Sequence, residues 1–387
     1  MNQANPDPPD KEGTVQTISL KSGGWVILGA CFLSLGILIW AVSSVFTSPA
    51  PIGDGNDITT YQFELGNLSV PESTLAASGN ARDFLDVYAF PETIPGSDIL
   101  AFNEKRRGNW LVTGDRVVGI EIDGVARAYP VHCLNAHEII QDSINGTRFS
   151  VTYSPLADAP VVVMSDPNTG FMDFGVSGLL CNSSLLMYNR DAVSPSLWSP
   201  LLGHAIAGPE VGKHVQVLPI VNICTWRDWL AEHPDTTVVL PDPANARRYK
   251  AFSYLRYFND RMDRLNFPVA PLPNEERPGS DLPRLKSRIV AVTAGGTTRV
   301  WPLMLFIKAL KDKGANEGTI TLKQSGVPLE FIVRHLPQSV YVRATDKSKI
   351  SVQPMLFFAW WCTHPETVEK DLVFELPKDA VVTPRSE

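Results

Sequence analysis

The pair of residues best suited to chemistry is His137-Glu138, in the segment LNAHEII. An imidazole has an ordinary pKa of about 6.5, so His137 could act as an acid or a base near neutral pH. We therefore take His137 and Glu138 as the candidate catalytic residues. The structural alternative is a histidine packed beside a strand and satisfied by a backbone carbonyl.

Cys133 and His137 are candidate metal ligands, because residues four apart share one face of a helix. His132 and His137 are five apart, which is not the spacing of the helical HExxH zinc pair. Two ligands do not make a metal site, and no third is visible. The sequence identifies no cofactor.

Polar groups that could bind a small molecule lie further along the chain. In VTYSPLADAPVVV (151–163), Tyr153 and Asp158 lie on either side of Ser154, which is in no G-x-S-x-G nucleophile elbow. In segments 174–190 and 196–209, polar side chains alternate with strands and glycines. This mixture suits a small-ligand pocket, and equally a sheet with one solvated face. The candidate ligand residues in these two segments are Ser177, Asn182, Tyr188, Arg190, Trp198 and Ser199.

Strands and hairpins must position these groups. The alternating segment 116–122, the turn Asp123-Gly124 and the returning segment 125–129 predict a hairpin. A second hairpin is expected over 139–153 around Asn145-Gly146, and this turn explains the N-x-T sequence there better than a glycosylation site does. Pro130 can begin a short helix running to about residue 138, and segment 225–233 predicts another helix. The predicted fold class is α+β, rich in β-structure.

The chain matches itself without a gap when segment 115–130 is laid on segment 287–302. The same shift places Gly146-Thr147 on Gly318-Thr319. Residues found in both copies should serve the fold, and residues found in one copy can serve chemistry. The residues shared in this match are Arg116/Arg288, Val118/Val290, Gly124/Gly296, Arg127/Arg299 and Pro130/Pro302, and the pair His233-Pro234 recurs at a shorter offset as His364-Pro365. His132, His137 and Glu138 face Met304, Ala309 and Leu310, so a site is expected in the first copy.

A membrane anchor is predicted at the N-terminus. Segment 25–46 is an apolar run without charge, and at about 1.5 Å per residue a helix of that length spans a hydrocarbon core of about 30 Å. Lys21 precedes the run, and the next basic residue is Arg82. The positive-inside rule therefore puts the N-terminus in the cytoplasm and the bulk of the chain outside the cytoplasmic membrane, with a single span.

The domain organisation follows from these features. We expect a cytoplasmic tail (1–24), a transmembrane helix (25–46), a tether (47–80), a first repeat copy (81–240), a connector (241–286) and a shortened second copy (287–387). The net charge of −7 and the absence of a basic cluster argue against nucleic-acid binding. The four cysteines after the span fit no zinc spacing and are expected to be scattered buried thiols, with a disulfide of unassigned pairing as the alternative.

Several long motifs, in order, resemble the DUF3179 family, a bacterial and archaeal domain of unknown function. They are LNAHEIIQD, VTYSPLADAPVVV, FGVSGLLCNSSLLMYNR, SLWSPLLGHAIAGP and TWRDWLAEHPDT. The resemblance covers about residues 85–371. It implies a mainly β, partly helical domain in exported or anchored proteins, and no established reaction.

The chain departs from the family at one informative place. Members usually carry Tyr-Cys-Pro-Leu-Cys-Gly, where this chain has Ser154 and Ala157 in place of the two cysteines. A hydroxyl and a methyl cannot replace a C-x-x-C in redox chemistry or metal binding. Ser184 and His204 also stand where the family has acidic residues. The family residues that are retained are His137, Glu138, Ser177, Asn182, Tyr188, Arg190, Trp198 and Ser199.

These observations predict a membrane-anchored, non-catalytic module that binds a ligand or acts in assembly. The alternative is an enzyme, or a metal- or cofactor-binding protein, that uses His137 and Glu138 with Cys133 and Asp158. A purely structural envelope protein is the third hypothesis. The expected partners are the membrane and a small molecule, and the sequence identifies no protein partner.

Overall fold

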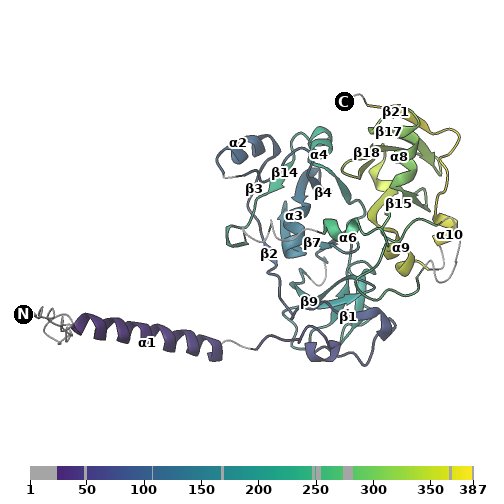
Figure 1. Cartoon of the computed structure of the whole chain (residues 1–387). Helices are drawn as coiled ribbons and strands as arrows, with labels where there is room; N and C mark the ends of the chain where they lie inside the picture. The colour runs from purple at the N-terminus through teal and green to yellow at the C-terminus, as the bar shows by residue number, and fades with distance from the viewer. Residues whose placement is uncertain are drawn as a thin grey trace, which may run out of the picture. The chain divides into compact units, whose positions relative to one another are not determined.

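The structure is a computed structural model that describes residues 24–47, 50–106, 108–166, 170–245, 249, 254–272, 282–365 and 368–385. The chain forms two compact units, Met1–Pro51 and Ile52–Glu387. In the first unit the described residues form the helix α1 (Gly24–Thr47), whose described side chains are mostly exposed (Figure 1). Among the described residues, no helix combines the length and the apolar character that crossing a membrane requires.

The second unit is built mainly from β-strands, as the sequence predicts. The largest sheet has the order β21-β17-β18-β19-β13-β4-β5-β14-β3. Its strands are β3 (Thr93–Pro95), β4 (Arg116–Ile122), β5 (Val125–Pro130), β13 (Asn222–Thr225), β14 (Thr237–Val239), β17 (Glu317–Gln324), β18 (Val327–Arg334), β19 (Ser339–Ala344) and β21 (Val381–Pro384).

Three smaller sheets complete the β-structure of the described residues. Their orders are β2-β6-β7-β8, β16-β15-β20 and β1-β9-β10-β11-β12. Their strands are β1 (Leu75–Ala77), β2 (Tyr88–Ala89), β6 (Ile139–Ile144), β7 (Thr147–Ser154), β8 (Ala159–Met164), β9 (Phe174–Cys181), β10 (Ser184–Asn189), β11 (Leu197–Ser199), β12 (His204–Ala207), β15 (Arg288–Ala294), β16 (Thr297–Pro302) and β20 (Ile350–Leu356).

Short helices connect the strands. The α-helices are α2 (Ile99–Glu104), α3 (Val131–His137), α4 (Trp226–Glu232), α6 (Leu255–Phe258), α8 (Leu303–Lys311), α9 (Phe357–Thr363) and α10 (Val368–Asp371). Single 3₁₀ turns are η2 (Ile58–Tyr61), η3 (Glu72–Thr74), η4 (Gly96–Asp98), η5 (Pro243–Asn245) and η6 (Lys347–Lys349).

The predicted hairpin turns are confirmed. Asp123-Gly124 and Asn145-Gly146 both have positive φ angles, at 50° and 77° and at 51° and 85° respectively. Two consecutive positive φ angles are what a two-residue hairpin turn with the twist of its strands requires, and Asn, Asp and Gly tolerate them best. The short helix after Pro130 is also confirmed as α3.

The two repeated sequence segments adopt one order of elements: a hairpin, a helix, a second hairpin and a third strand. The first hairpins begin at Arg116 and Arg288, which the sequence match aligns with each other. The second hairpins fall out of that alignment, because α8 has 9 residues where α3 has 7 and a longer connection follows it. The expected match of Gly146-Thr147 to Gly318-Thr319 is therefore wrong. The turn at Asn145-Gly146 instead corresponds to the turn at Ser325-Gly326.

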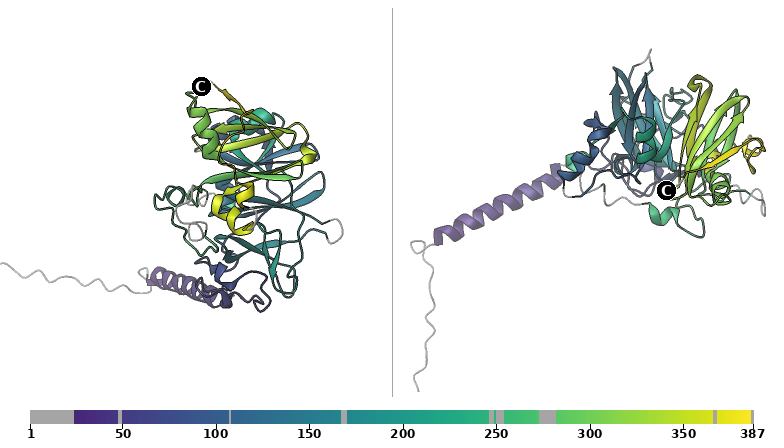
Figure 2. Two further views of the ribbon diagram at one scale, coloured as in Figure 1. Left: turned by 90° about the vertical axis from the view of Figure 1, so that its right-hand side faces the viewer. Right: turned by 90° about the horizontal axis from the view of Figure 1, so that it is seen from above.

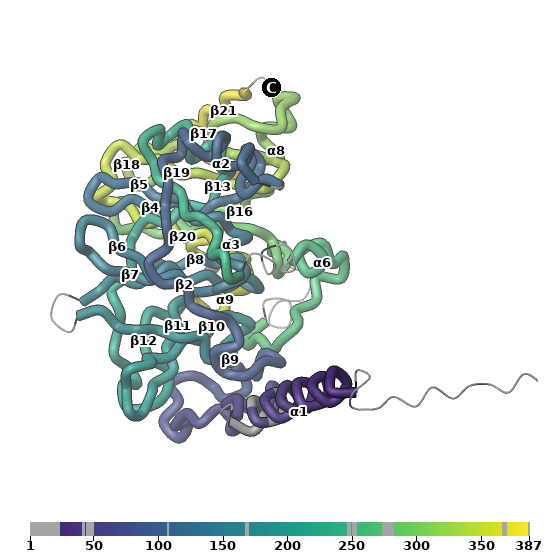
Figure 3. The backbone as a smooth tube through the Cα atoms, turned by 90° about the vertical axis from the view of Figure 1, so that its left-hand side faces the viewer, coloured from purple at the N-terminus to yellow at the C-terminus, as the bar shows by residue number. Residues whose placement is uncertain are grey.

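The two copies share one sheet. The meander β17-β18-β19 of the second copy joins the large sheet beside β13, β4 and β5 of the first, through the pair Ile223 and Val340 (Figure 3). An isolated bridge between Ile220 and Val352 links the first copy to β20. Figure 2 shows the first copy in blue and teal beside the second in green and yellow. The second copy thus extends a sheet of the first.

Residues 52–80, which the sequence predicts as part of a tether, belong to the folded unit. The Tyr61 side chain is fully buried, and its hydroxyl donates to the carbonyl of Asn80 at 2.5 Å. Leu75 pairs with Cys181 where β1 meets β9. These few apolar side chains fix the segment to the sheet although its composition is polar.

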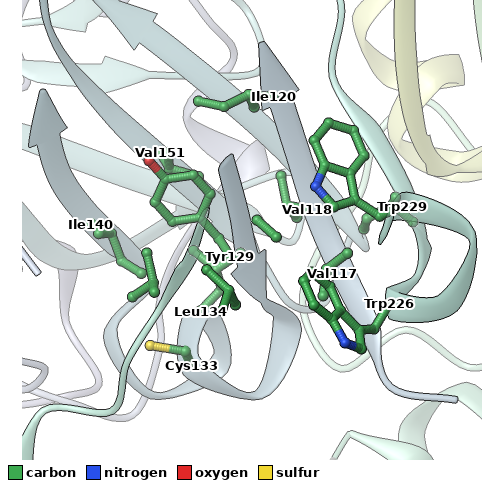
Figure 4. Close-up of a cluster of buried hydrophobic side chains, with 14 of the residues drawn as sticks. Val117, Val118, Ile120, Tyr129, Cys133, Leu134, Ile140, Val151, Trp226 and Trp229 are labelled. Carbon is green, nitrogen blue, oxygen red and sulfur yellow. The ribbon is translucent and has the colours of Figure 1, made fainter. Parts of the chain in front are cut away.

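The core beside the site is formed where α4 packs on β4 (Figure 4). Trp226 and Trp229 are buried against this strand. Gly119 makes the contact possible, because a Cβ at this position would lie 2.2 Å from Cε3 of Trp229. This packing fixes β4 and β5, and they in turn fix α3.

Candidate functional site

Glu138 leaves the end of α3 in the left-handed conformation, with φ 57° and ψ −28°. Its amide donates to the carbonyl of Leu134 at 2.7 Å, which closes the helix, and its own carbonyl accepts from the amide of Tyr153 at 2.8 Å. These two bonds tie the helix end to β7. A non-glycine residue in this conformation is uncommon and costs free energy, so its surroundings must hold it there.

The Glu138 side chain lines a cavity of about 610 Å³, which we call the Glu138 cavity. Apolar side chains dominate its wall. Burial raises the pKa of the Glu138 carboxyl to about 8, so the neutral acid and the carboxylate coexist near neutral pH. The lining residues are Ser78, Asn80, Phe84, Leu85, Glu138, Ser154, Pro155, Leu156, Leu180, Leu185, Tyr254, Asn266 and Phe267.

Ser154, at the first position where the resemblance implies a cysteine, lines this cavity. It is the last residue of β7, and its hydroxyl accepts from the amide of Leu185 at 3.1 Å. Ala157, at the second cysteine position, is fully buried. The cavity therefore presents a hydroxyl and a carboxyl from adjacent segments of the first copy.

His137, the other predicted catalytic residue, points into the core. Its Nδ1 lies 2.7 Å from the carbonyl oxygen of Asp86, and its Nε2 lies 2.9 Å from the Tyr249 hydroxyl. The side chain is fully buried. His137 therefore positions α3, as the structural alternative predicts, and Glu138 alone of the pair faces the cavity.

The two predicted metal ligands, Cys133 and His137, are both buried in the core. Cys133 is fully buried, and burial raises the pKa of its thiol. The ring of His137 is engaged at both nitrogens. Across the part of the chain that the structure describes, no group of three or more His, Cys, Asp or Glu side chains could hold a metal ion. Cys133, Cys181, Cys224 and Cys362 are free thiols.

Tyr153 and Asp158 belong to a buried charge cluster. Asp158 accepts from the Tyr153 hydroxyl at 2.7 Å, from Arg116 Nη2 at 2.9 Å and from Arg288 Nε at 2.6 Å. Burial alone would raise the pKa of Asp158, but the two guanidinium groups outweigh it and hold that pKa below its ordinary value. The carboxylate is therefore charged and shared by two arginines.

Two of the remaining predicted ligand residues bond the same partly exposed carboxylate, that of Asp83. The Tyr188 hydroxyl donates to the carboxylate of Asp83, and Arg190 Nη2 donates to the same group at 2.9 Å.

The other four predicted ligand residues lie in or beside sheet β1-β9-β10-β11-β12 and are engaged in packing or in bonds to the backbone. Ser177 Oγ donates to the carbonyl of Leu186 at 2.6 Å, and Asn182 Oδ1 accepts from the amide of Ala270 at 3.0 Å. Trp198 is 1% exposed and packs on Phe174. Ser199 Oγ accepts from the amide of Leu202 at 3.2 Å. None of these six ligand candidates lines the Glu138 cavity.

Sequence reasoning missed part of the cavity wall. Tyr254 and Phe267 come from the predicted connector, whose composition indicates only turns. Arg116 and Arg288 carried a usable signal, because both copies keep a charged residue where a buried strand begins.

Comparison with known proteins places the chain in a family. Neither the curated proteins nor the solved structures contain a match to it. The model of one family, described as "Protein of unknown function (DUF3179)", matches residues 91–367. This region holds Glu138, Ser154 and most of both copies of the repeat, and the chain therefore belongs to the DUF3179 family.

Proposed function

We propose that this protein binds a small molecule in the Glu138 cavity. The observation that carries the proposal is a protonatable carboxyl, with its pKa raised to about 8, in the wall of a mostly apolar cavity of about 610 Å³. Small-molecule sites have volumes of about 300–1,000 Å³ and few polar groups among apolar walls. The ligand is a mostly apolar molecule with one amine or hydrogen-bonding group opposite Glu138.

The residues at the family's cysteine positions favour binding over thiol chemistry. The Ser154 hydroxyl is an unactivated donor and acceptor, with no imidazole among the residues of the same cavity wall. Ala157 contributes only a methyl group to the core. Of the groups that could do chemistry at these positions, the first copy retains the Glu138 carboxyl in the wall of the cavity.

The test is a thermal-shift screen of small amines and apolar alcohols against the full chain, followed by calorimetric titration of the hits. Glu138→Gln should weaken binding about tenfold or more, because a charge-assisted hydrogen bond is lost. Leu156→Trp should abolish binding by filling the cavity. Leu100→Trp, at a position 70% exposed in α2, is the matched control and should bind like wild type. Equal binding by wild type and Leu156→Trp would refute the proposal.

Acid–base catalysis by Glu138 is the second candidate, favoured by the raised pKa. A carboxyl that titrates near neutral pH can both give and take a proton. The same two variants separate the candidates. Conversion of a bound hit that stops in Glu138→Gln, while the hit still binds, would identify an enzyme.

The location of the protein is a further proposal, and it rests on the sequence. We propose that the uncharged run 25–46 anchors the chain in the cytoplasmic membrane, with Lys21 inside and the repeat unit outside. Recovery of the protein in the membrane fraction after alkaline carbonate, with protease digesting residues beyond 52 from the outside only, is the expected result. Release into the soluble fraction would contradict the anchor.

A further inference from the structure

A second, larger cavity lies where the two repeat copies meet. It has a volume of about 870 Å³, and we call it the junction cavity. Arg116 of the first copy and Arg288 of the second both line it, and they begin the equivalent strands β4 and β15. His132 and Met304 also line it. The sequence match aligns these two residues with each other, and it aligns Arg116 with Arg288 in the same way. The cavity thus lies between equivalent elements of the two copies.

The charges at this junction are not balanced. Arg116 and Arg288 share the single carboxylate of Asp158. The residue equivalent to Asp158 in the second copy is Gln338, which lies between β18 and β19 as Asp158 lies between β7 and β8. Arg288 Nη1 meets the Gln338 amide oxygen at 3.5 Å, where a symmetric arrangement would supply a second carboxylate. Among the described residues, one guanidinium charge therefore has no acidic partner.

The other charged groups of the wall largely offset one another. Asp263 accepts from the amides of Leu285 and Lys286, and Asp115 accepts from the amide of Val112. The Lys286 side chain is 2% exposed, and its Nζ donates to two backbone carbonyls and lies 3.9 Å from Asp260, a carboxylate that also pairs with Arg264. Arg284 is 61% exposed and lies 3.8 Å from Asp263. Two acids and two bases thus leave the excess positive charge of the arginine pair in place.

Two buried nitrogens also lack a partner among the described residues. They are Nε of Arg116 and Nε2 of His132, and both residues line the junction cavity. A buried polar group without a hydrogen bond costs about 1–3 kcal/mol, and more when it is charged. An anion in the cavity would supply a counter-charge to the Arg116 guanidinium group.

We propose that the junction cavity binds a small molecule through an oxyanion group, a carboxylate or a phosphate, held by Arg288 and Arg116. The planar guanidinium group matches both oxyanions in geometry. The arginine side chains are 20% and 13% exposed, so a ligand in the cavity can reach them. Tyr254 lines this cavity and the Glu138 cavity, but the inference does not require the Glu138 cavity to be occupied.

The test uses the full chain and two probes, inorganic phosphate and succinate, titrated calorimetrically at low ionic strength. Wild type should bind one of them saturably, and the preferred probe identifies the oxyanion class. Gln338→Glu supplies the missing carboxylate without removing an arginine. It should lower the affinity at least tenfold, which is about 1.4 kcal/mol, and should raise the midpoint of thermal unfolding without ligand.

The matched control is Gln216→Glu, which makes the same charge change at an exposed position outside the junction cavity. It should bind the probe within a factor of about two of wild type. The inference is overturned if neither probe binds saturably to wild type, or if Gln338→Glu binds as tightly as wild type. Ligands of the Glu138 cavity should bind the Gln338→Glu variant as they bind wild type. A failure of this inference is therefore distinguishable from a failure of the proposed function.

Discussion

At the scale of the residue, one backbone conformation separates two neighbours. Glu138 takes a positive φ at the end of α3 and turns its side chain toward the cavity, whereas His137 is still helical and faces Asp86 and Tyr249. The carboxyl is left among apolar walls, and its pKa rises to about 8 for that reason. The same burial that suits it to a ligand makes its ionised form costly to the fold.

Glu138 should therefore make stability depend on pH. Because its pKa is higher folded than unfolded, the folded state holds the proton more tightly, and stability falls as pH rises from about 4.5 to about 8. Glu138→Gln should remove this fall and be more stable than wild type by about 2–4 kcal/mol above about pH 8. Urea denaturation at a series of pH values checks this. A wild-type curve parallel to that of Glu138→Gln would contradict it.

The sequence predicts the importance of Glu138 but not how the pair divides its work. His137 and Glu138 are adjacent, and nothing local tells which side chain faces a cavity. That outcome depends on Tyr249, which contacts His137 from 112 residues along the chain, and on Tyr153, whose amide donates to the carbonyl of Glu138. Asp158 was predicted as a ligand residue for the same local reasons, and its partner Arg288 is 130 residues away.

At the scale of the element, the two copies solve the same packing problem with different residues. Gly119 in β4 lies against Trp229, and the equivalent residue in β15 is Ala291. The helices α4 and α9 end alike, because His233 stacks on Trp229 at 4.0 Å and His364 on Trp360 at 3.7 Å between ring centroids. In both copies the histidine also closes its helix, because its backbone amide donates to the carbonyl of Trp229 or Trp360.

Substitution at the equivalent positions should have unequal effects. Gly119→Ala places a Cβ 2.2 Å from the Trp229 ring, and it should lower the free energy of unfolding by about 2–3 kcal/mol. The matched change Ala291→Gly should cost only about 1 kcal/mol, through backbone freedom and a small loss of burial. Chemical denaturation of both variants measures this. Equal losses would mean that the tryptophan moves aside freely.

At the scale of the whole molecule, the repeat could be found in the sequence but the sheet that the two copies share could not. Identical residues at aligned positions of segments 115–130 and 287–302 reveal the duplication, because turns and helix starts demand particular residues. The contact of β13 with β19 has one backbone pair, Ile223 with Val340, and a bond from the amide of Val342 to Oδ1 of Asn222. A buried strand as short as β13 carries no pattern that predicts its neighbour.

Neither copy should fold without the other. Residues 52–245 alone would leave β13 without β19 and expose the edge of the large sheet, and residues 254–387 would lose the same partner. We expect each fragment to lack a cooperative unfolding transition and the co-expressed pair to recover one. Circular dichroism during thermal unfolding tests this. A cooperative transition in residues 52–245 alone would show that the first copy folds without the pairing of β13 with β19.

The repeat unit resembles a homodimer whose two subunits have been joined into one polypeptide. In a true homodimer every residue at the two-fold axis occurs twice, so a site there must be self-complementary. Joining the subunits removes that constraint, and the junction shows the result: Asp158 on one side and Gln338 on the other. A covalent dimer of this kind can hold a ligand that has no symmetry of its own.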